Sequence, residues 1–177
     1  SVRWLDALYR LARKACADDF TAEETREPPL LREYFGKHFA DSLRRELAEK
    51  IAMPLEIIPA QRFSVYCCGP IALHDDTHNY PDLHFVIVVA HSGRLGVVDS
   101  TGRAARHRTG EILLLDPHGK HALVREGLIA AEHVYDQTHG PVHDPRDQFL
   151  FVSFDVAEAN MNAWLHAAAN VAVSLDC

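Results

Sequence analysis

The feature that most constrains the fold is a series of short apolar runs between residues 60 and 155. The runs are rich in β-branched and aromatic residues, and turns rich in Gly, Asp, Pro and His separate them. No helical pattern between the runs is long enough for a parallel crossover, so we predict an antiparallel barrel or sandwich. The runs are FSVYCC (63–68), LHFVIVVA (83–90), RLGVVD (94–99), EILLLD (111–116), HALVR (121–125) and QFLFVSFD (148–155).

Apolar residues at helical spacing flank this β region on both sides. Residues 4–15 show the spacing first, and residues 31–51 show it again before Pro54 ends the helix. After Asp155, a candidate N-cap, the chain again reads as a helix. We therefore expect one domain, 1–177, with helical N-terminal support (1–55), a β core (60–155) and a C-terminal helix (156–170).

Composition argues against several classes of protein. The 47% hydrophobic content suffices for a core, yet no run of eighteen apolar residues is present, so we expect no membrane span. A net charge of -7 with no long basic block argues against binding to a nucleic-acid backbone. We expect a small-molecule or peptide substrate instead. The oligomeric state does not follow from the sequence.

The cysteines and the N-terminus bear on the cellular compartment. The 4 Cys of this chain do not form a disulfide framework, and Cys67 and Cys68 point to opposite faces of a strand. They therefore read as small core thiols and not as a shared metal site. No apolar signal region follows Ser1, which we interpret as a trimmed end. We expect a cytoplasmic protein.

The stretch LHDDTHNYPDLHF (73–85) crowds His and Asp residues beside an apolar run. On an extended segment His74 and Asp76 project from the same face, so an imidazole and a carboxylate can converge on one point. His121, at the start of the run 121–125, is the candidate third ligand. Two His and one carboxylate on one face of an octahedron leave three positions open, as in Fe(II) oxygenases. The alternative is a set of surface histidines held in hydrogen bonds.

The order of these segments resembles the Fe(II)- and 2-oxoglutarate-dependent oxygenases, most of all their small prolyl-hydroxylase-like members. The segments that carry the resemblance are FSVYCCGPIALHDD, RLGVVD, GEILLLDPHGKHALV and PRDQFLFVSFD, and the match covers about residues 60 to 155. It implies a double-stranded β-helix core of the jelly-roll or cupin-like type with flanking helices. It also implies Fe(II) held by His74, Asp76 and His121, and oxidation of a substrate C–H bond with succinate and CO₂ as coproducts.

The resemblance also implies which residues bind 2-oxoglutarate. Arg146, near the start of the last run, would pair with the distal carboxylate, and Tyr66 would donate a hydrogen bond to it. Arg146 follows His121 at a longer interval than the family shows, which an inserted loop explains. Arg125 is the nearer alternative, since it shares the face of His121 on an extended strand.

Two other functions stay open at this point. GEILLLDPHGKH is close to the second cupin motif, so His74, His78 and either His118 or His121 would form a cupin ligand set. Such an enzyme would be a metal-dependent dioxygenase or isomerase that uses no 2-oxoglutarate. The other alternative is a ligand-sensing β-barrel without a catalytic metal.

Overall fold

The structure is a computed structural model that describes residues 10, 29–98, 104–125 and 148–175. The predicted helix over residues 4–15 lies outside these ranges except for Arg10, and so does Arg146. The described elements are α2 (Pro29–His38), α3 (Ala40–Lys50), η1 (Leu55–Ile57), β1 (Phe63–Cys68), β2 (Ile71–His74), β3 (Leu83–His91), β4 (Leu95–Val98), β5 (Ala104–Arg106), β6 (Ile112–Leu115), β7 (His121–Arg125), β8 (Phe149–Ala157) and α5 (Glu158–Leu175).

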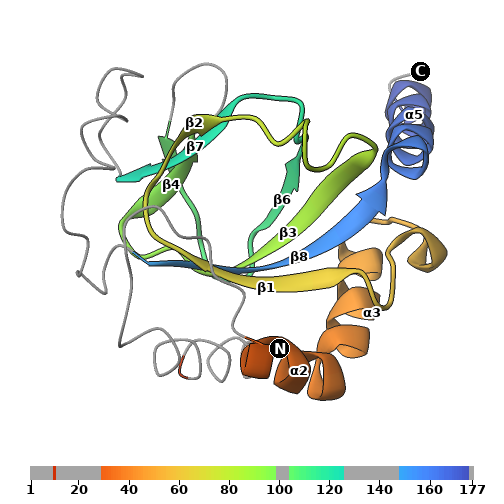
Figure 1. The fold of residues 1–177 in the computed structure, drawn as a ribbon. Coiled ribbons are helices and arrows are strands. Elements are labelled where there is room, and N and C mark those ends of the chain that lie inside the picture. The colour runs from red at the N-terminus through yellow and green to blue at the C-terminus, as the bar shows by residue number, and fades with distance from the viewer. Residues whose placement is uncertain (1–9, 11–28, 99–103, 126–147, 176–177) are drawn as a thin grey trace.

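The strands form two four-stranded sheets that face each other (Figure 1). The first, sheet A, has the order β1-β8-β3-β6, and the second, sheet B, has the order β2-β7-β4-β5. Neighbouring strands pair antiparallel in both sheets. The chain crosses repeatedly from one sheet to the other, and its first and last strands lie side by side. This winding is a jelly roll, or double-stranded β-helix, as the sequence predicts.

The predicted runs agree with the observed strands, and two further strands were not predicted. β1 and β7 have the predicted bounds, whereas β3, β4, β6 and β8 differ from prediction by one or two residues at their ends. The two missed strands are β2 and β5, which are only four and three residues long. Strands so short offer too few residues for an alternating pattern to appear.

Helical residues 31–51 form two helices where the sequence predicts one. α2 and α3 meet at Phe39, whose carbonyl accepts a hydrogen bond from the Ser42 hydroxyl at 2.9 Å. A hydroxyl that shares a helix carbonyl with a backbone N–H often accompanies a bend. Phe35 and Leu43, one on each helix, are both buried.

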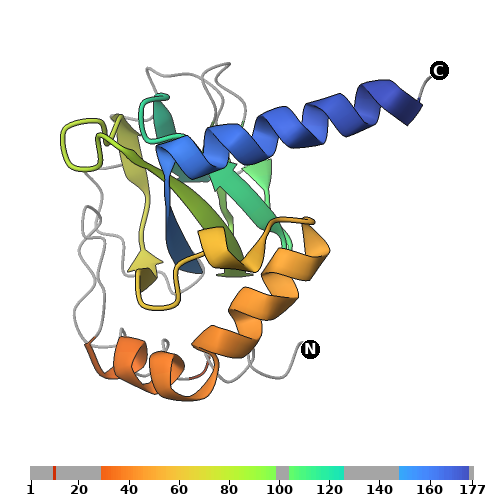
Figure 2. The same cartoon turned by 90° about the vertical axis from the view of Figure 1, so that its right-hand side faces the viewer.

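The predicted N-cap at Asp155 is wrong. Asp155 lies inside β8 and pairs with Phe85 of β3, and its backbone N–H donates to the Arg62 carbonyl at 3.0 Å. Strand pairing therefore continues to Ala157, and α5 begins at Glu158. Figure 2 shows α5 on the same side of the molecule as α3, with its far half extending beyond the sheets. The division of the chain at residues 55, 60 and 156 stays a prediction.

Apolar residues pack in three clusters that define the layers. The largest lies between sheet A and the helices and contains Val65 and Phe154, neither of which is exposed. A second fills the space between the sheets and includes Leu123 and Phe149. A third lies on the outer face of sheet B. Alternation along each strand thus assigns every second residue to the interior between the sheets.

The two adjacent cysteines follow this alternation, as predicted. Cys67 packs toward the helices and Cys68 packs between the sheets, and both are buried. They cannot share one metal ion. Among the described residues no helix is both long enough and apolar enough to span a membrane.

Candidate metal centre

The pairing of β2 with β7 brings the two predicted histidine ligands together. His74 is the register partner of His121, and their ring centroids are 4.4 Å apart. On β7, Leu123 packs between the sheets while its neighbours Ala122 and Val124 pack on the outer face. His121 shares the face of Leu123 because the two are two residues apart. The histidine pair therefore faces the interior of the jelly roll.

Asp76 reaches the same point from a loop and not from an extended strand. β2 ends at His74, and the predicted extended geometry over residues 74–76 does not continue to Asp76. The Asp76 backbone N–H donates to the Pro117 carbonyl at 2.8 Å. The Asp76 carbonyl accepts hydrogen bonds from the N–H groups of Asn79 and Tyr80 at 3.0 and 2.9 Å. Main-chain hydrogen bonds therefore fix the position from which its carboxylate projects.

A tight turn before β7 orients the ring of His121. In the sequence Asp-Pro-His-Gly, the Gly119 N–H donates to the Asp116 carbonyl at 3.1 Å, as in a type I turn with Pro at its second position. The Gly119 carbonyl then accepts a hydrogen bond from His121 Nδ1 at 2.9 Å. A metal-binding histidine commonly donates one ring N–H to a backbone carbonyl, which directs the other nitrogen to the metal.

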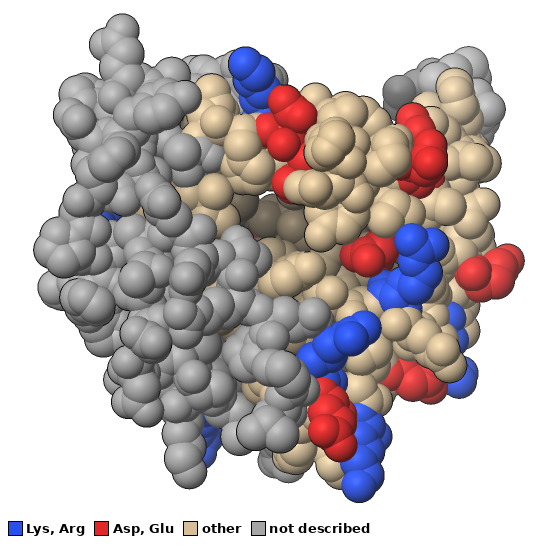
Figure 3. Space-filling view, viewed as in Figure 1, with Lys and Arg blue, Asp and Glu red and all other residues tan. Residues whose placement is uncertain are grey.

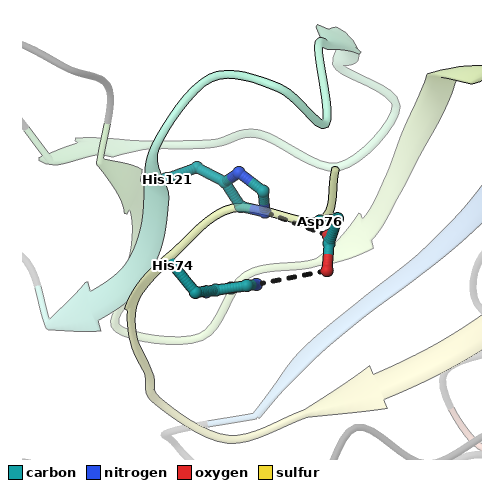
Figure 4. Close-up of side chains that lie close together, drawn as sticks. All are labelled: His74, Asp76 and His121. Carbon is teal, nitrogen blue, oxygen red and sulfur yellow. Dashed lines mark ion pairs between the residues drawn. The ribbon is translucent and has the colours of Figure 1, made fainter. Parts of the chain in front are cut away.

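The three side chains converge on one point (Figure 4). Asp76 Oδ1 lies 3.8 Å from His74 Nε2, and Asp76 Oδ2 lies 3.4 Å from His121 Nε2. One potential ligand atom from each residue lies within 4.8 Å of the others. Ligand atoms bound to one transition metal at about 2.1 Å lie about 3 Å apart in adjacent octahedral positions. Small side-chain movements would bring the possible ligand atoms of the three residues to these separations around such an ion.

The ionisable side chains of Asp76 and His121 shift the pKa values of one another. The contact with His121 lowers the pKa of Asp76 despite its partial burial, with a further contribution from His74. Burial opposes protonation of His121, but the Asp76 carboxylate and the Gly119 carbonyl raise its pKa above the usual 6.5. The side chain of His121 is 11% exposed and that of Asp76 is 23% exposed. A carboxylate held ionised beside two imidazoles matches the charge that a divalent cation requires.

Of the alternative cupin set, His74 and His121 lie together, whereas His78 and His118 do not join them. His78 lies exposed in the turn after Asp76, and His118 contacts residues outside the group of possible ligands. His118 Nε2 contacts the Pro81 carbonyl at 3.0 Å and its Nδ1 contacts Asp116 Oδ1 at 2.9 Å. Within the described part of the chain, His74, Asp76 and His121 form the group that could hold a metal ion. The sequence left open whether His118 or His121 would be the ligand, and the described group contains His121 and not His118.

Residues from sheet A line the interior opposite the trio. Tyr66 is half-buried, packs with the inter-sheet cluster, and contacts the ring of Phe151 with centroids 5.3 Å apart. Ser153 lies two residues beyond Phe151 and therefore faces the same interior. It is 2% exposed, and its hydroxyl has no hydrogen-bond partner. A buried hydroxyl left unpaired costs about 1–3 kcal/mol, so a bound polar group is its natural partner.

Of the two arginines considered for cosubstrate binding, Arg125 is among the described residues and Arg146 is not. Arg125 ends β7 and stands four residues from His121 on the same face of the strand. Its register partner is Leu95, which packs between the sheets. Arg146 lies outside the described residues, so the predicted preference for Arg146 over Arg125 stays a prediction.

Sequence reasoning missed the residues that support the ligands. Pro117 and Gly119 act through their carbonyls, and only the turn sequence around them gives a signal. Ser153 gives a weak signal, as a polar residue at an inward position of an apolar strand. Figure 3 shows that the surface is hollowed at the centre of the jelly roll, with acidic side chains at the upper rim of the hollow.

Comparisons with known proteins add little to this description. Neither a protein-family model nor a curated protein sequence matches the chain. The solved structures that resemble it include a conserved protein with a double-stranded β-helix domain from Klebsiella pneumoniae, with 20% identity and a TM-score of 0.33 over 54% of this chain and 62% of that one. Another is a protein from Neisseria meningitidis, with 14% identity and a TM-score of 0.33 over 57% and 80%. The match spans less than two thirds of the Klebsiella protein. The fold assignment rests on the strand order.

Proposed function

We propose that this protein is an Fe(II)- and 2-oxoglutarate-dependent oxygenase. It oxidises a C–H bond of a small molecule or peptide side chain and releases succinate and CO₂ as coproducts. The observation that carries the proposal is the convergence of two imidazoles and one carboxylate inside a jelly roll. This donor set is the one that non-haem Fe(II) oxygenases use.

The residues fit a metal ion in three respects. The donor set combines imidazole nitrogens with a carboxylate, which suits Fe(II) better than a thiolate-preferring ion. His121 has the second-shell hydrogen bond that leaves Nε2 as a ligand. Asp76 is fixed through its main chain, so its carboxylate needs little ordering on binding. His74, Asp76 and His121 would hold the ion.

A bound Fe(II) would supply the chemistry that activates O₂ and couples 2-oxoglutarate decarboxylation to substrate oxidation. The protein residues would bind the ion, orient the cosubstrate and exclude water. Three protein ligands would leave coordination positions for the cosubstrate and O₂. The apolar cluster beside the histidines, which includes Leu123 and Val89, would exclude water from that side of the site.

The cosubstrate would lie between the histidine pair and the inner face of sheet A. Tyr66 and Ser153 offer hydroxyl groups there, and Arg125 or Arg146 would pair with the distal carboxylate. We expect Ser153→Ala to raise the 2-oxoglutarate concentration required for half-saturation while leaving metal affinity unchanged. Ser42→Ala is the control, because Ser42 is an exposed serine on α3, outside the space between the sheets.

A second candidate function is a cupin-type dioxygenase or isomerase that uses the same metal without 2-oxoglutarate. The inner face of β8 favours it, because residues 149–157 present Phe149, Phe151, Ser153 and Asp155 toward sheet B. No Lys or Arg lies on this described strand, where the resemblance places a basic residue. The lining suits an apolar substrate as well as a charged cosubstrate.

An anaerobic titration separates the two candidates. Fe(II)-loaded protein is titrated with 2-oxoglutarate, and the visible charge-transfer band of the chelate is recorded. The proposal expects a saturable band that Asp76→Ala abolishes. Stoichiometric iron without a band would favour the cupin-type enzyme, and failure to bind iron would favour the ligand-sensing barrel.

A further inference from the structure

His118 joins the two segments that supply the metal ligands. It lies in the turn before β7, yet its Nε2 contacts the carbonyl of Pro81 at 3.0 Å, in the loop that follows Asp76. Its Nδ1 and its backbone N–H each lie 2.9 Å from Asp116 Oδ1, within the turn itself. One side chain therefore spans from the turn of His121 to the loop of Asp76.

The chemistry of the partners fixes the protonation of the ring. A backbone carbonyl and a carboxylate only accept hydrogen bonds, so both ring nitrogens of His118 must carry a proton. The Asp116 carboxylate raises the pKa of His118, although partial desolvation opposes it, and the Pro81 carbonyl and Glu158 of α5 add to the rise. His84 of β3 also faces this group, with its Nε2 3.8 Å from Asp116 Oδ1.

The turn that His118 holds also bears directly on both ligand segments. The Pro117 carbonyl accepts the Asp76 N–H, and the Gly119 carbonyl accepts His121 Nδ1–H. Pro117 and Gly119 are the chain neighbours of His118. A shift of the turn relative to the loop would therefore change the separation of Asp76 and His121, which is now 3.4 Å between Oδ2 and Nε2.

We propose that His118 is a positioning residue that sets the spacing of the metal ligands by holding the 116–119 turn against the Pro81 carbonyl. It binds no metal itself. This inference rests on the proposed metal centre and names a support for it that lies outside the ligand set.

The two ring nitrogens can be tested separately. In His118→Gln the side-chain amide nitrogen replaces Nε2 and keeps a donor for Pro81, whereas in His118→Asn it replaces Nδ1 and leaves Pro81 without a donor. We expect His118→Asn to weaken Mn²⁺ binding roughly tenfold, the lower end of the loss seen when a residue that orients a metal ligand is disturbed. His118→Gln should retain an affinity close to that of the wild type. His78→Gln, an exposed histidine in the same loop, is the control and should change nothing.

Free Mn²⁺ measured by electron paramagnetic resonance gives the affinities. Equal affinity of the wild type and His118→Asn would overturn the positioning role while leaving the metal centre in place. Equal losses in the Asn and Gln variants would overturn the assignment to the Pro81 contact. A wild type that binds no Mn²⁺ or Fe(II) would overturn the metal centre itself.

A second measurement does not depend on variants that fold. Nitrogen-15 spectra of the metal-free wild-type protein at neutral pH should show Nε2 of His118 protonated. A ring protonated at Nδ1 alone would overturn the proposal, because the contact with the Pro81 carbonyl would then lack a hydrogen.

Discussion

The substitution Asp76→Asn tests the proposed metal centre most directly. It removes the negative charge from the trio but keeps the size of the side chain. The main-chain hydrogen bonds of residue 76 to Pro117, Asn79 and Tyr80 are independent of the side chain, so the loop should keep its conformation. The variant should therefore fold and lose metal affinity.

The magnitude follows from ligand linkage. A metal present at one hundred times its Kd stabilises the native state by about 2.7 kcal/mol. For a chain of 177 residues each kcal/mol raises Tm by about 2–4 °C, so the wild type should gain about 5–10 °C. Replacing the anionic ligand by a neutral amide should weaken binding about 100-fold, which leaves about 0.4 kcal/mol, or about 1 °C, at the same metal concentration.

Calorimetric scans with and without Mn²⁺ measure this difference. Asp75→Asn is the matched control, because Asp75 is the exposed neighbour of Asp76 and is not in the ligand group. It should show the full wild-type gain in Tm. If Asp76→Asn gained as much as the wild type, Asp76 would not be a ligand and the proposed centre would be refuted.

Three further predictions concern the cosubstrate, the core and pH. Arg146→Ala should raise the 2-oxoglutarate requirement in activity assays while sparing metal binding, and the same result for Arg125→Ala instead would transfer that role to β7. Phe154→Ala should cost about 3–5 kcal/mol in denaturant unfolding, because this unexposed ring packs between the sheet and the helices; a loss below about 1 kcal/mol would contradict that packing. The Arg108 backbone N–H lowers the pKa of Glu111, so its carboxylate stabilises the fold above the unfolded value of 4.5 and loses that effect as pH falls below it. The stability difference between the wild type and Glu111→Gln should shrink in acid, and a constant difference would count against this linkage.

The strands were predictable where a run was rich in β-branched or aromatic residues and was also long enough to show a pattern. FSVYCC and HALVR have β-branched or aromatic residues bounded by turn residues, and both form strands with the predicted bounds. β5 is only three residues long, too short for any pattern to show. The end of β8 was misplaced because Asp155 is a good N-cap in isolation, while pairing with β3 holds it in the sheet.

The candidate site was predictable in its members but not in its construction. His74, Asp76 and His121 were chosen on residue type and spacing, and the structure places them together. The reason offered for Asp76, an extended segment, was wrong, because a hydrogen bond to Pro117 forty-one residues away positions it. Long-range main-chain contacts of this kind leave no local pattern. The sequence left His118 open as a ligand for the same reason, since its contact with Pro81 leaves no local pattern either.

The position of β8 between β1 and β3 has a consequence for how the protein is made. β8 follows all the other described strands in the sequence, yet it lies between β1 and β3 in sheet A. Until the ribosome releases it, β1 and β3 have no partner between them, and the layer beneath the helices lacks Leu150, Val152 and Phe154. Such distant pairings fold slowly. The jelly roll can therefore close only after β8 has left the ribosome, and a chain truncated before β8 should aggregate instead of forming a partial metal site.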